Sequence, residues 1–427
     1  MNIDFKAKFN ELKDKLGKRN MIIIASSIIA VLLIILIVCL VCCNTGKNTY
    51  TITYELNGGT ISESAPKSYT TEKGDIVIVN PTKDGYTFLG WTTDSITTPT
   101  KDLIITKGTT GDLTLTANWQ VSYYSYADNT QTSVYFGSYP QTKVTDDTLI
   151  ATLTEKTGGI PSSFDSRNWT NYGYYISGSV SSCMYYIDID NDNDGTYDYR
   201  GVYINQYRPY YTTDTSSNTY QDDNGYTRYN IYWFKYEKVK WNILKTENGK
   251  ALIVSDMLLD SQDYYYSTST RSGATDYQGN LTTDTVYSNN YMYSYIREWL
   301  NETFYDATFN ASEKGIIETT LIDNSAATTG SETNAYACGN TSDKIFLLSY
   351  KEATTYYSSD SERQAKGTDY AKSQGLYVSS GNSYYWLCSP GYDIGSYARF
   401  VDYGGSNNFN YVYDTSNGVR AACWINL

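Results

Sequence analysis

The sequence predicts an α+β protein with a transmembrane helix near its N-terminus, then a small β-rich module and a large mixed domain. Residues 21–43 form one uncharged, mostly apolar run. Further along, short segments that alternate between apolar and polar residues indicate strands. A helix within the C-terminal region is indicated by apolar residues at helical spacing, Ile296, Trp299, Leu300 and Phe304. Helices and strands that occupy separate segments favour the α+β class.

The apolar run at residues 21–43 has the length of a membrane-spanning helix. At about 1.5 Å per residue it would extend roughly 34 Å, which exceeds the roughly 30 Å of a bilayer core. Several Lys and Arg residues precede the run, whereas Lys47 alone follows it closely. This asymmetry predicts a single-pass protein of the cell membrane, with residues 1–20 in the cytoplasm and residues 44–427 outside the cell.

Two other interpretations of this segment are considered. A lipid anchor would use Cys43, although Cys42 is an unusual residue before a modified cysteine. A cleaved signal peptide would have a shorter apolar region and a small-residue cleavage site, and neither is evident. The membrane helix is therefore the first expectation and the lipid anchor is the alternative.

Charge and composition limit the classes of function. The chain has a formal net charge of −13 and contains no His. Such an acidic chain is not expected to have nucleic acid as a partner. The lack of His excludes Ser-His-Asp and Cys-His nucleophiles and histidine metal triads. Carboxylate pairs, metal-bound water and cysteine chemistry remain open.

Tyrosine is the most unusual feature of the composition, with 47 Tyr against 11 Phe and 8 Trp. Tyrosine together with Ser, Asn and Gly is typical of recognition surfaces, since its stiff ring offers contact area and its hydroxyl offers hydrogen bonds. Tyrosine is also an ordinary strand residue in β-rich proteins. Both interpretations stay open for individual tyrosines.

Residues 44–119 form the first module beyond the apolar run. An alternating segment turns at Asn57-Gly58-Gly59, a typical hairpin signal. The module resembles the internalin-type B repeat, also called the Listeria–Bacteroides repeat. The resemblance depends on Asn57-Gly58-Gly59, Pro81, Gly85-Tyr86-Thr87-Phe88, Gly90-Trp91 and Ala117-Asn118-Trp119. It implies a small β-grasp-like module that acts as a spacer or weak binding unit on bacterial surface proteins, with Trp91 and Trp119 in its core.

After a linker at residues 120–132, residues 133–427 resemble an uncharacterised domain family of Gram-positive surface proteins. The residues that show this resemblance are VYFGSYPQT (134–142), YRGVYINQYRPY (199–210), the segment 232–265, the segment 295–317, KIFLLSYKEA (344–353), YWLCSPG (385–391) and NGVRAACWINL (417–427). The domain also looks like the C-type-lectin/sulfatase-modifying-factor superfold. That likeness implies a mixed sheet that the terminal strand closes.

Local patterns agree with such a mixed domain. A hairpin turn is expected at Glu247-Asn248-Gly249. Asn310 with Glu313, and Ser349 with Glu352, have the spacing of capping boxes at helix N-termini. The last segment alternates like a strand, with Val419, Ala421, Cys423, Ile425 and Leu427 on one side.

An acidic stretch at residues 188–201 is the candidate metal site. Asp190, Asp192 and Asp194 fall at positions one, three and five of a calcium loop, with Thr196 and Asp198 at seven and nine. Position twelve is Gly instead of Glu, and a strand pattern follows, so an EF-hand is excluded. A calcium ion held between two strands and an empty acidic hairpin tip are both open.

The candidate ligand surface is the segment 392–418, between two strands of the predicted fold. The residues expected to contact a ligand are Tyr392, Tyr397, Arg399, Tyr403, Asn408, Tyr411 and Tyr413. In lectin-like folds the equivalent region displays the ligand surface, so the resemblance implies binding of an unknown glycan or protein ligand. An ordinary polar hairpin with aromatic cross-strand pairs is the alternative.

The predicted function is therefore adhesion or recognition by a bacterial cell-surface protein, without catalysis. A structural surface scaffold is the alternative. An enzyme of the sulfatase-modifying-factor type is less favoured, because no motif places a copper-binding cysteine pair on this chain. A disulfide between Cys388 and Cys423 is also expected, because both depart from the residues usual in the family pattern and the superfold would place their strands close together.

Overall fold

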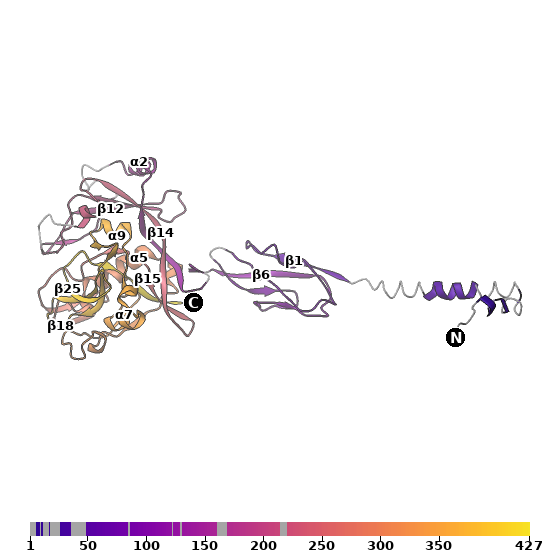
Figure 1. The fold of residues 1–427 in the computed structure, drawn as a ribbon. Coiled ribbons are helices and arrows are strands. Elements are labelled where there is room, and N and C mark those ends of the chain that lie inside the picture. Colours follow the sequence, from indigo (N-terminus) through magenta and orange to yellow (C-terminus); the bar gives the residue numbers. More distant parts are fainter. Residues whose placement is uncertain are drawn as a thin grey trace. The chain divides into compact units, whose positions relative to one another are not determined.

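The protein is described by a computed structural model that covers residues 6–8, 10–11, 17, 26–35, 48–83, 86–121, 123–128, 130–159, 169–213 and 220–427. The chain divides into two compact units, Met1–Ser122 and Tyr123–Leu427 (Figure 1). The first unit contains the small module and the second unit the large domain.

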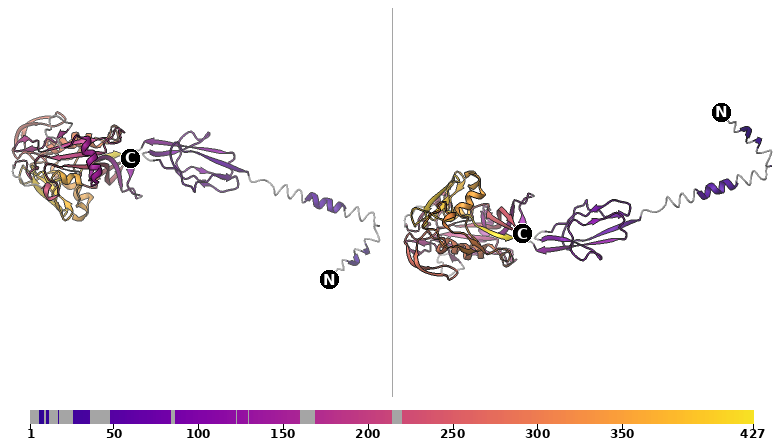
Figure 2. Two further views of the ribbon diagram at one scale, coloured as in Figure 1. Left: turned by 90° about the horizontal axis from the view of Figure 1, so that it is seen from above. Right: turned by 90° about the horizontal axis from the view of Figure 1, so that it is seen from below.

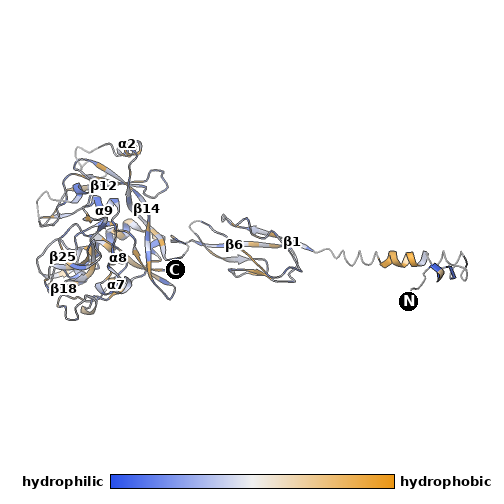
Figure 3. Cartoon of the chain, in the orientation of Figure 1, coloured by the Kyte–Doolittle hydropathy of each residue, from blue (hydrophilic) through white to orange (hydrophobic). Residues whose placement is uncertain are grey.

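The predicted transmembrane helix is not supported. Within the span 21–43, residues 26–35 are described and form an apolar helix (Figure 3). Among the described residues, no helix has the length and apolar character needed to cross a membrane. The expectations of a membrane helix and of a membrane partner are corrected accordingly. The cysteine considered for a lipid anchor, Cys43, lies outside the described residues.

The small unit is a four-stranded sheet with the order β2-β1-β6-β4. Its central strands β1 and β6 are parallel, and the other two pairings are antiparallel. A two-stranded sheet, β3 with β5, accompanies it. The strands are β1 (Thr49–Glu55), β2 (Ser68–Thr70), β3 (Ile76–Val77), β4 (Tyr86–Thr92), β5 (Ile104–Ile105) and β6 (Leu113–Val121).

The predicted core tryptophans of this unit differ in burial. Trp91 is fully buried, whereas Trp119 is half-buried and donates its Nε1–H to the carbonyl of Leu56 at 2.9 Å. The turn expected at Asn57-Gly58-Gly59 is formed, and a Cβ at Gly59 would lie 2.5 Å from the Trp119 ring. The tight approach of this ring therefore requires glycine there. β1 pairs antiparallel with the next strand, β2, but the connection spans residues 56–67 instead of a tight two-residue turn, and β1 also pairs with β6.

The large domain is built on an eight-stranded sheet in which each pairing is antiparallel. The long strand β14 lies at its centre, between β13 and β15, and also pairs with β8. The strands are β7 (Ser125–Tyr126), β8 (Ser133–Lys143), β9 (Thr170–Asn171), β12 (Met184–Ile189), β13 (Tyr199–Ile204), β14 (Ile231–Glu247), β15 (Lys250–Ser255) and β27 (Ala422–Asn426). The terminal strand β27 forms one edge of this sheet beside β15, and the sheet is antiparallel instead of mixed.

A second, five-stranded sheet has the order β16-β26-β23-β24-β25. Figures 1 and 2 show it among the orange and yellow segments, beside the magenta and pink strands of the first sheet. Its strands are β16 (Asp260–Ser261), β23 (Tyr385–Pro390), β24 (Tyr397–Val401), β25 (Asn407–Tyr411) and β26 (Gly418–Val419). Short two-stranded pairs complete the domain: β10 (Tyr175–Ile176) with β11 (Ser179–Val180), β17 (Arg271–Thr275) with β18 (Leu281–Val286), β19 (Thr320–Ile322) with β20 (Thr341–Asp343), and β21 (Val378–Ser379) with β22 (Asn382–Ser383).

The helices are short, so the fold is mostly β and the predicted α+β class is corrected. The helix expected around Trp299 is divided into α4 (Tyr295–Trp299), η3 (Leu300–Phe304) and α5 (Tyr305–Thr308). Its predicted apolar face is nevertheless buried. The remaining helices are α2 (Asp147–Lys156), α3 (Tyr220–Asp223), η2 (Tyr291–Tyr293), α6 (Ala311–Lys314), η4 (Ala326–Thr328), α7 (Tyr350–Tyr356), α8 (Asp360–Arg363) and α9 (Asp369–Ser373). Both predicted capping boxes are present, at α6 and α7.

Candidate functional site

Half-exposed tyrosines gather on the five-stranded side of the large domain. They form two groups of touching rings, which we call together the tyrosine band. One group runs through ring contacts of 4.2–6.0 Å between centroids: Tyr210, Tyr220, Tyr377, Tyr384 and Tyr403. The other group runs through contacts of 4.6–5.3 Å: Tyr211, Tyr413, Tyr411 and Tyr397. Tyr210 of the first group and Tyr211 of the second are adjacent in the chain.

Two distant chain segments are held together to form this band. Tyr211 forms an antiparallel bridge with Asp414, and the Thr212 amide donates to the carbonyl of Tyr413 at 3.0 Å. The Thr415 hydroxyl donates to the carbonyl of Pro209 at 2.6 Å. The segment after β13 is thereby held beside the segment after β25. Tyr211 of one segment and Tyr413 of the other consequently touch, with ring centroids 5.3 Å apart.

The band offers ring faces and neutral hydroxyl groups. Tyr403 is 39% exposed and Tyr411 is 37% exposed, and the other rings of the band are half-buried. Burial, followed by the nearby Tyr411, raises the pKa of Tyr413 to about 12. Burial also raises the pKa of Tyr220 above its ordinary value. These hydroxyls therefore stay protonated near neutral pH and can both donate and accept hydrogen bonds.

The predicted ligand residues separate into those inside the band and those outside it. Tyr397, Tyr403, Tyr411 and Tyr413 belong to the band. The others are Tyr392, Arg399 and Asn408. Tyr392 is 44% exposed and packs on Phe409, with ring centroids 5.0 Å apart. Asn408 is exposed on β25, and strand alternation turns it away from the face that carries Tyr411.

Arg399 holds the fold instead of facing a ligand. The side chain is buried, and its guanidinium lies 4.1 Å from the ring centroid of Phe409 and 4.4 Å from that of Tyr350. Its Nε–H donates to the carbonyl of Thr329 at 3.2 Å. The structure therefore gives this predicted contact residue a packing role.

Several band residues were missed in the sequence: Tyr210, Tyr211, Tyr220, Tyr377 and Tyr384. They lie outside the segment 392–418 that resembled a ligand surface. The adjacent pair Tyr210-Tyr211 was one available signal. The contacts that bring these residues to the segment 392–418 could not be read from local pattern.

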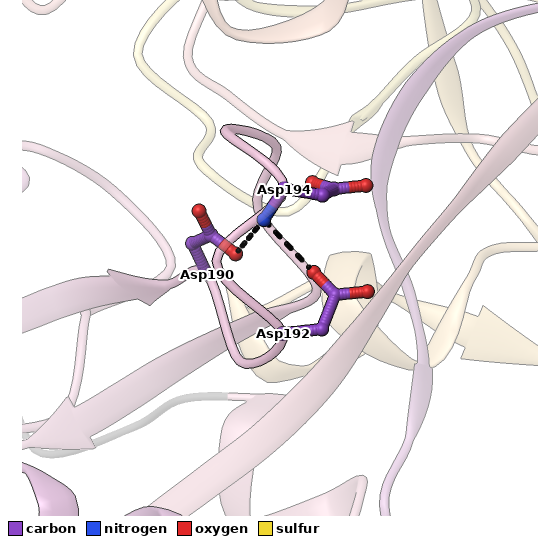
Figure 4. Close-up of side chains that lie close together, drawn as sticks. All are labelled: Asp190, Asp192 and Asp194. Carbon is purple, nitrogen blue, oxygen red and sulfur yellow. Dashed lines mark hydrogen bonds between the residues drawn. The ribbon is translucent and has the colours of Figure 1, made fainter.

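The aspartate loop, residues 190–198, connects β12 to β13 at a hairpin tip. Asp190, Asp192 and Asp194 each place a carboxylate oxygen within 4.8 Å of the others (Figure 4). The Asp194 amide donates to both Asp190 and Asp192 at 3.2 Å, and the Gly195 amide donates to Asp190 at 2.9 Å. The carboxylates of Asp190 and Asp192 thus both point toward the backbone amide of Asp194 (Figure 4).

The other two predicted calcium ligands, Thr196 and Asp198, form hydrogen bonds within the loop. Thr196 donates its hydroxyl to Asp194 at 2.6 Å, and this bond and that of its amide lower the pKa of Asp194. Asp198 accepts from the Asn191 amide at 2.6 Å. The strand β13 that follows confirms that the loop is not an EF-hand. Carboxylate oxygens in this arrangement suit a hard cation such as calcium.

The predicted disulfide is not formed. Cys388 lies in β23 of the five-stranded sheet, and Cys423 lies in β27 of the eight-stranded sheet. Cys423 pairs with Ile253 of β15, and the Cys388 amide donates to the carbonyl of Leu348 at 3.0 Å. Both are buried free thiols, and burial raises their pKa values above the ordinary range.

Comparison with known proteins supports part of the resemblance seen in the sequence. Residues 50–118 match the Listeria-Bacteroides repeat domain. Residues 248–427 match a domain of unknown function (DUF6273). No curated protein and no solved structure matches the chain, so the lectin-like superfold is not confirmed. The two matched domains indicate a surface-associated protein of unknown function.

Proposed function

We propose that this surface-associated protein binds a glycan through the tyrosine band. The observation that carries the proposal is that half-exposed tyrosine rings from distant chain segments touch one another in the two groups of the band. The apolar C–H face of a sugar packs on an aromatic ring, while the hydroxyl of tyrosine meets the sugar hydroxyls. The rings are already packed against one another, so little conformational freedom is lost on binding.

A protein ligand is the second candidate, because tyrosine is also enriched at the centres of protein interfaces. A scaffold without a ligand is the third. The proposal is one of binding and not of catalysis, since a chain without histidine lacks the commonest proton-transfer group. The small module is proposed as a spacer or weak binding unit. Calcium in the aspartate loop is proposed as a structural ion of the β12–β13 hairpin.

The test is a glycan array probed with the full chain, followed by affinity measurements on the glycans that bind. Tyr403→Ala and Tyr411→Ala change one exposed ring in each group of the band. Loss of a stacked aromatic ring is expected to weaken binding about five- to tenfold, from roughly 1 kcal/mol per ring contact. Tyr135→Ala is the matched control, since Tyr135 is also 39% exposed but lies in β8, outside the band.

Equal losses in the control and in the band variants would contradict the proposal. Absence of any glycan signal, together with capture of a host protein that depends on Tyr403 and Tyr411, would favour the protein ligand. Absence of both would favour the scaffold.

A further inference from the structure

A cleft of about 400 Å³ lies in the large domain and is lined by residues that do not belong to the tyrosine band. It is surrounded by aromatic side chains from separate elements, Tyr139 of β8, Tyr186 of β12, Tyr295 and Trp299 of α4, and Tyr370 of α9. Its volume suits a ligand of the size of a disaccharide. The rings give it walls on which a sugar can pack.

Most charges around this cleft are already paired. Arg200 donates two hydrogen bonds of 2.7 Å to Asp188, and both side chains are nearly buried. Asp306 at the edge forms an ion pair with Lys314 at 2.6 Å. No cation is thus left over among the described lining residues to receive an anionic ligand.

Asp260 is different, because it lines the cleft and takes part in no ion pair among the described residues. Its side chain is buried, with the residue only 2% exposed. It accepts hydrogen bonds from the Tyr139 hydroxyl at 2.7 Å, from the Ser261 amide at 2.7 Å and from Gln262 Nε2 at 3.1 Å. The nearby Arg208 is already paired with Asp263.

The neighbouring amide supplies a second acceptor. Gln262 lines the cleft and is 1% exposed, and its buried Oε1 has no hydrogen-bond partner among the described residues. A buried acceptor without a donor costs free energy, so a donor from a ligand would be favourable there. A buried carboxylate and a buried amide oxygen without a donor, both beside aromatic rings, together favour a ligand group that is cationic and carries N–H donors.

We propose that this cleft binds a sugar that carries a protonated amine, such as a glucosamine unit of a de-N-acetylated glycan. The ammonium group lies toward Asp260 and Gln262, and the sugar ring packs against the tyrosine walls. This site is separate from the tyrosine band and does not depend on binding there.

The test compares disaccharides that differ at one position on each sugar ring. The full chain is titrated by calorimetry with the β-1,4 disaccharide of glucosamine, with cellobiose and with the N,N′-diacetylated disaccharide. Cellobiose has a hydroxyl where the first has an ammonium group. The glucosamine disaccharide is expected to bind at least about tenfold more tightly than the other two, as a charge-assisted hydrogen bond would produce. Equal affinities, or no binding of the glucosamine disaccharide, would overturn the proposal.

Asp260→Asn removes the charge with little change of shape and is expected to abolish the discrimination between glucosamine disaccharide and cellobiose. If this variant does not fold, pH provides the second measurement on the unaltered protein. Affinity for the glucosamine disaccharide should fall as the pH is raised through the pKa of the sugar amine, while affinity for cellobiose stays constant. A preference that persists in Asp260→Asn, or that is independent of this pH change, refutes the assignment.

Tyr411→Ala separates this proposal from the one for the tyrosine band. The variant is expected to retain the discrimination between the disaccharides, because Tyr411 does not line the cleft. Loss of the discrimination in Tyr411→Ala would place amine recognition in the band and contradict the cleft site.

Discussion

Replacement of Arg297 by Met should strongly destabilise the large domain. The Arg297 side chain is 1% exposed and the side chain of its partner Asp343 is 0% exposed. Arg297 donates Nε–H to Asp343 at 2.8 Å and Nη1–H to Asp276 at 3.2 Å. Nη1 also donates to the carbonyl of Met292 at 2.7 Å. The residue therefore ties helix α4 to the β17–β18 and β19–β20 hairpins.

The expected loss in the free energy of unfolding depends on the hydrogen bonds that the partner carboxylate keeps after the substitution. Removing one partner of a buried ion pair costs roughly 3–5 kcal/mol. Asp343 would keep hydrogen bonds from the Thr341 hydroxyl at 2.7 Å and the Tyr277 hydroxyl at 3.1 Å. These remaining donors favour the lower end, about 3 kcal/mol. Met preserves much of the length and apolar contact of the side chain, so little of the loss comes from packing.

The assay is urea unfolding of the full chain, followed by tryptophan fluorescence. Lys314→Met is the control, because its ion pair with Asp306 has side-chain exposures of 27% and 72%. Such a partly exposed pair is expected to change the free energy of unfolding by less than about 1 kcal/mol. If Arg297→Met lowers the free energy of unfolding by less than about 1 kcal/mol, the buried ion pairs of Arg297 do not stabilise the domain as argued.

Three further outcomes are expected. Calcium at about 1 mM should raise the melting temperature of the full chain, and Asp192→Ala should remove the increase. If calcium does not raise the melting temperature of the parent protein, the aspartate loop is an acidic hairpin tip without calcium. Gly405→Ala should destabilise the fold more than Gly249→Ala. Both glycines have positive φ, but only a Cβ at Gly405 would overlap a neighbouring carbonyl. Equal losses of unfolding free energy in the two variants would contradict this prediction. Mass spectrometry after alkylation in denaturant without reductant should label Cys388 and Cys423, and a bridged mass would restore the predicted disulfide.

Features that depend on neighbouring residues could be predicted from the sequence. The turn between β14 and β15 has φ of 52° at Asn248 and 74° at Gly249, the left-handed conformation that two-residue hairpins require. The capping box of Ser349 with Glu352 is formed as expected. In each case the residues that determine the structure are adjacent in the chain, so their pattern is sufficient.

Features that depend on distant segments could not be predicted in this way. The turn at Asn57-Gly58-Gly59 forms and β1 pairs antiparallel with β2, but the parallel partner of β1 is β6, about sixty residues away. The disulfide prediction was wrong for the same reason. It relied on the lectin-like superfold to place the strands of Cys388 and Cys423 close together, whereas both are free thiols on strands of different sheets.

The excess of tyrosine shows what composition alone could and could not predict. Some tyrosines are ordinary core residues: Tyr264 and Tyr385 are buried and donate their hydroxyls at 2.8 Å to the carbonyls of Cys388 and Arg363. Those of the tyrosine band keep exposed ring area and pack on other tyrosines. Some tyrosines thus fit the interpretation as ordinary strand residues, and others fit the interpretation as a recognition surface. Burial separates the two kinds, and burial depends on sheet order, which composition cannot specify.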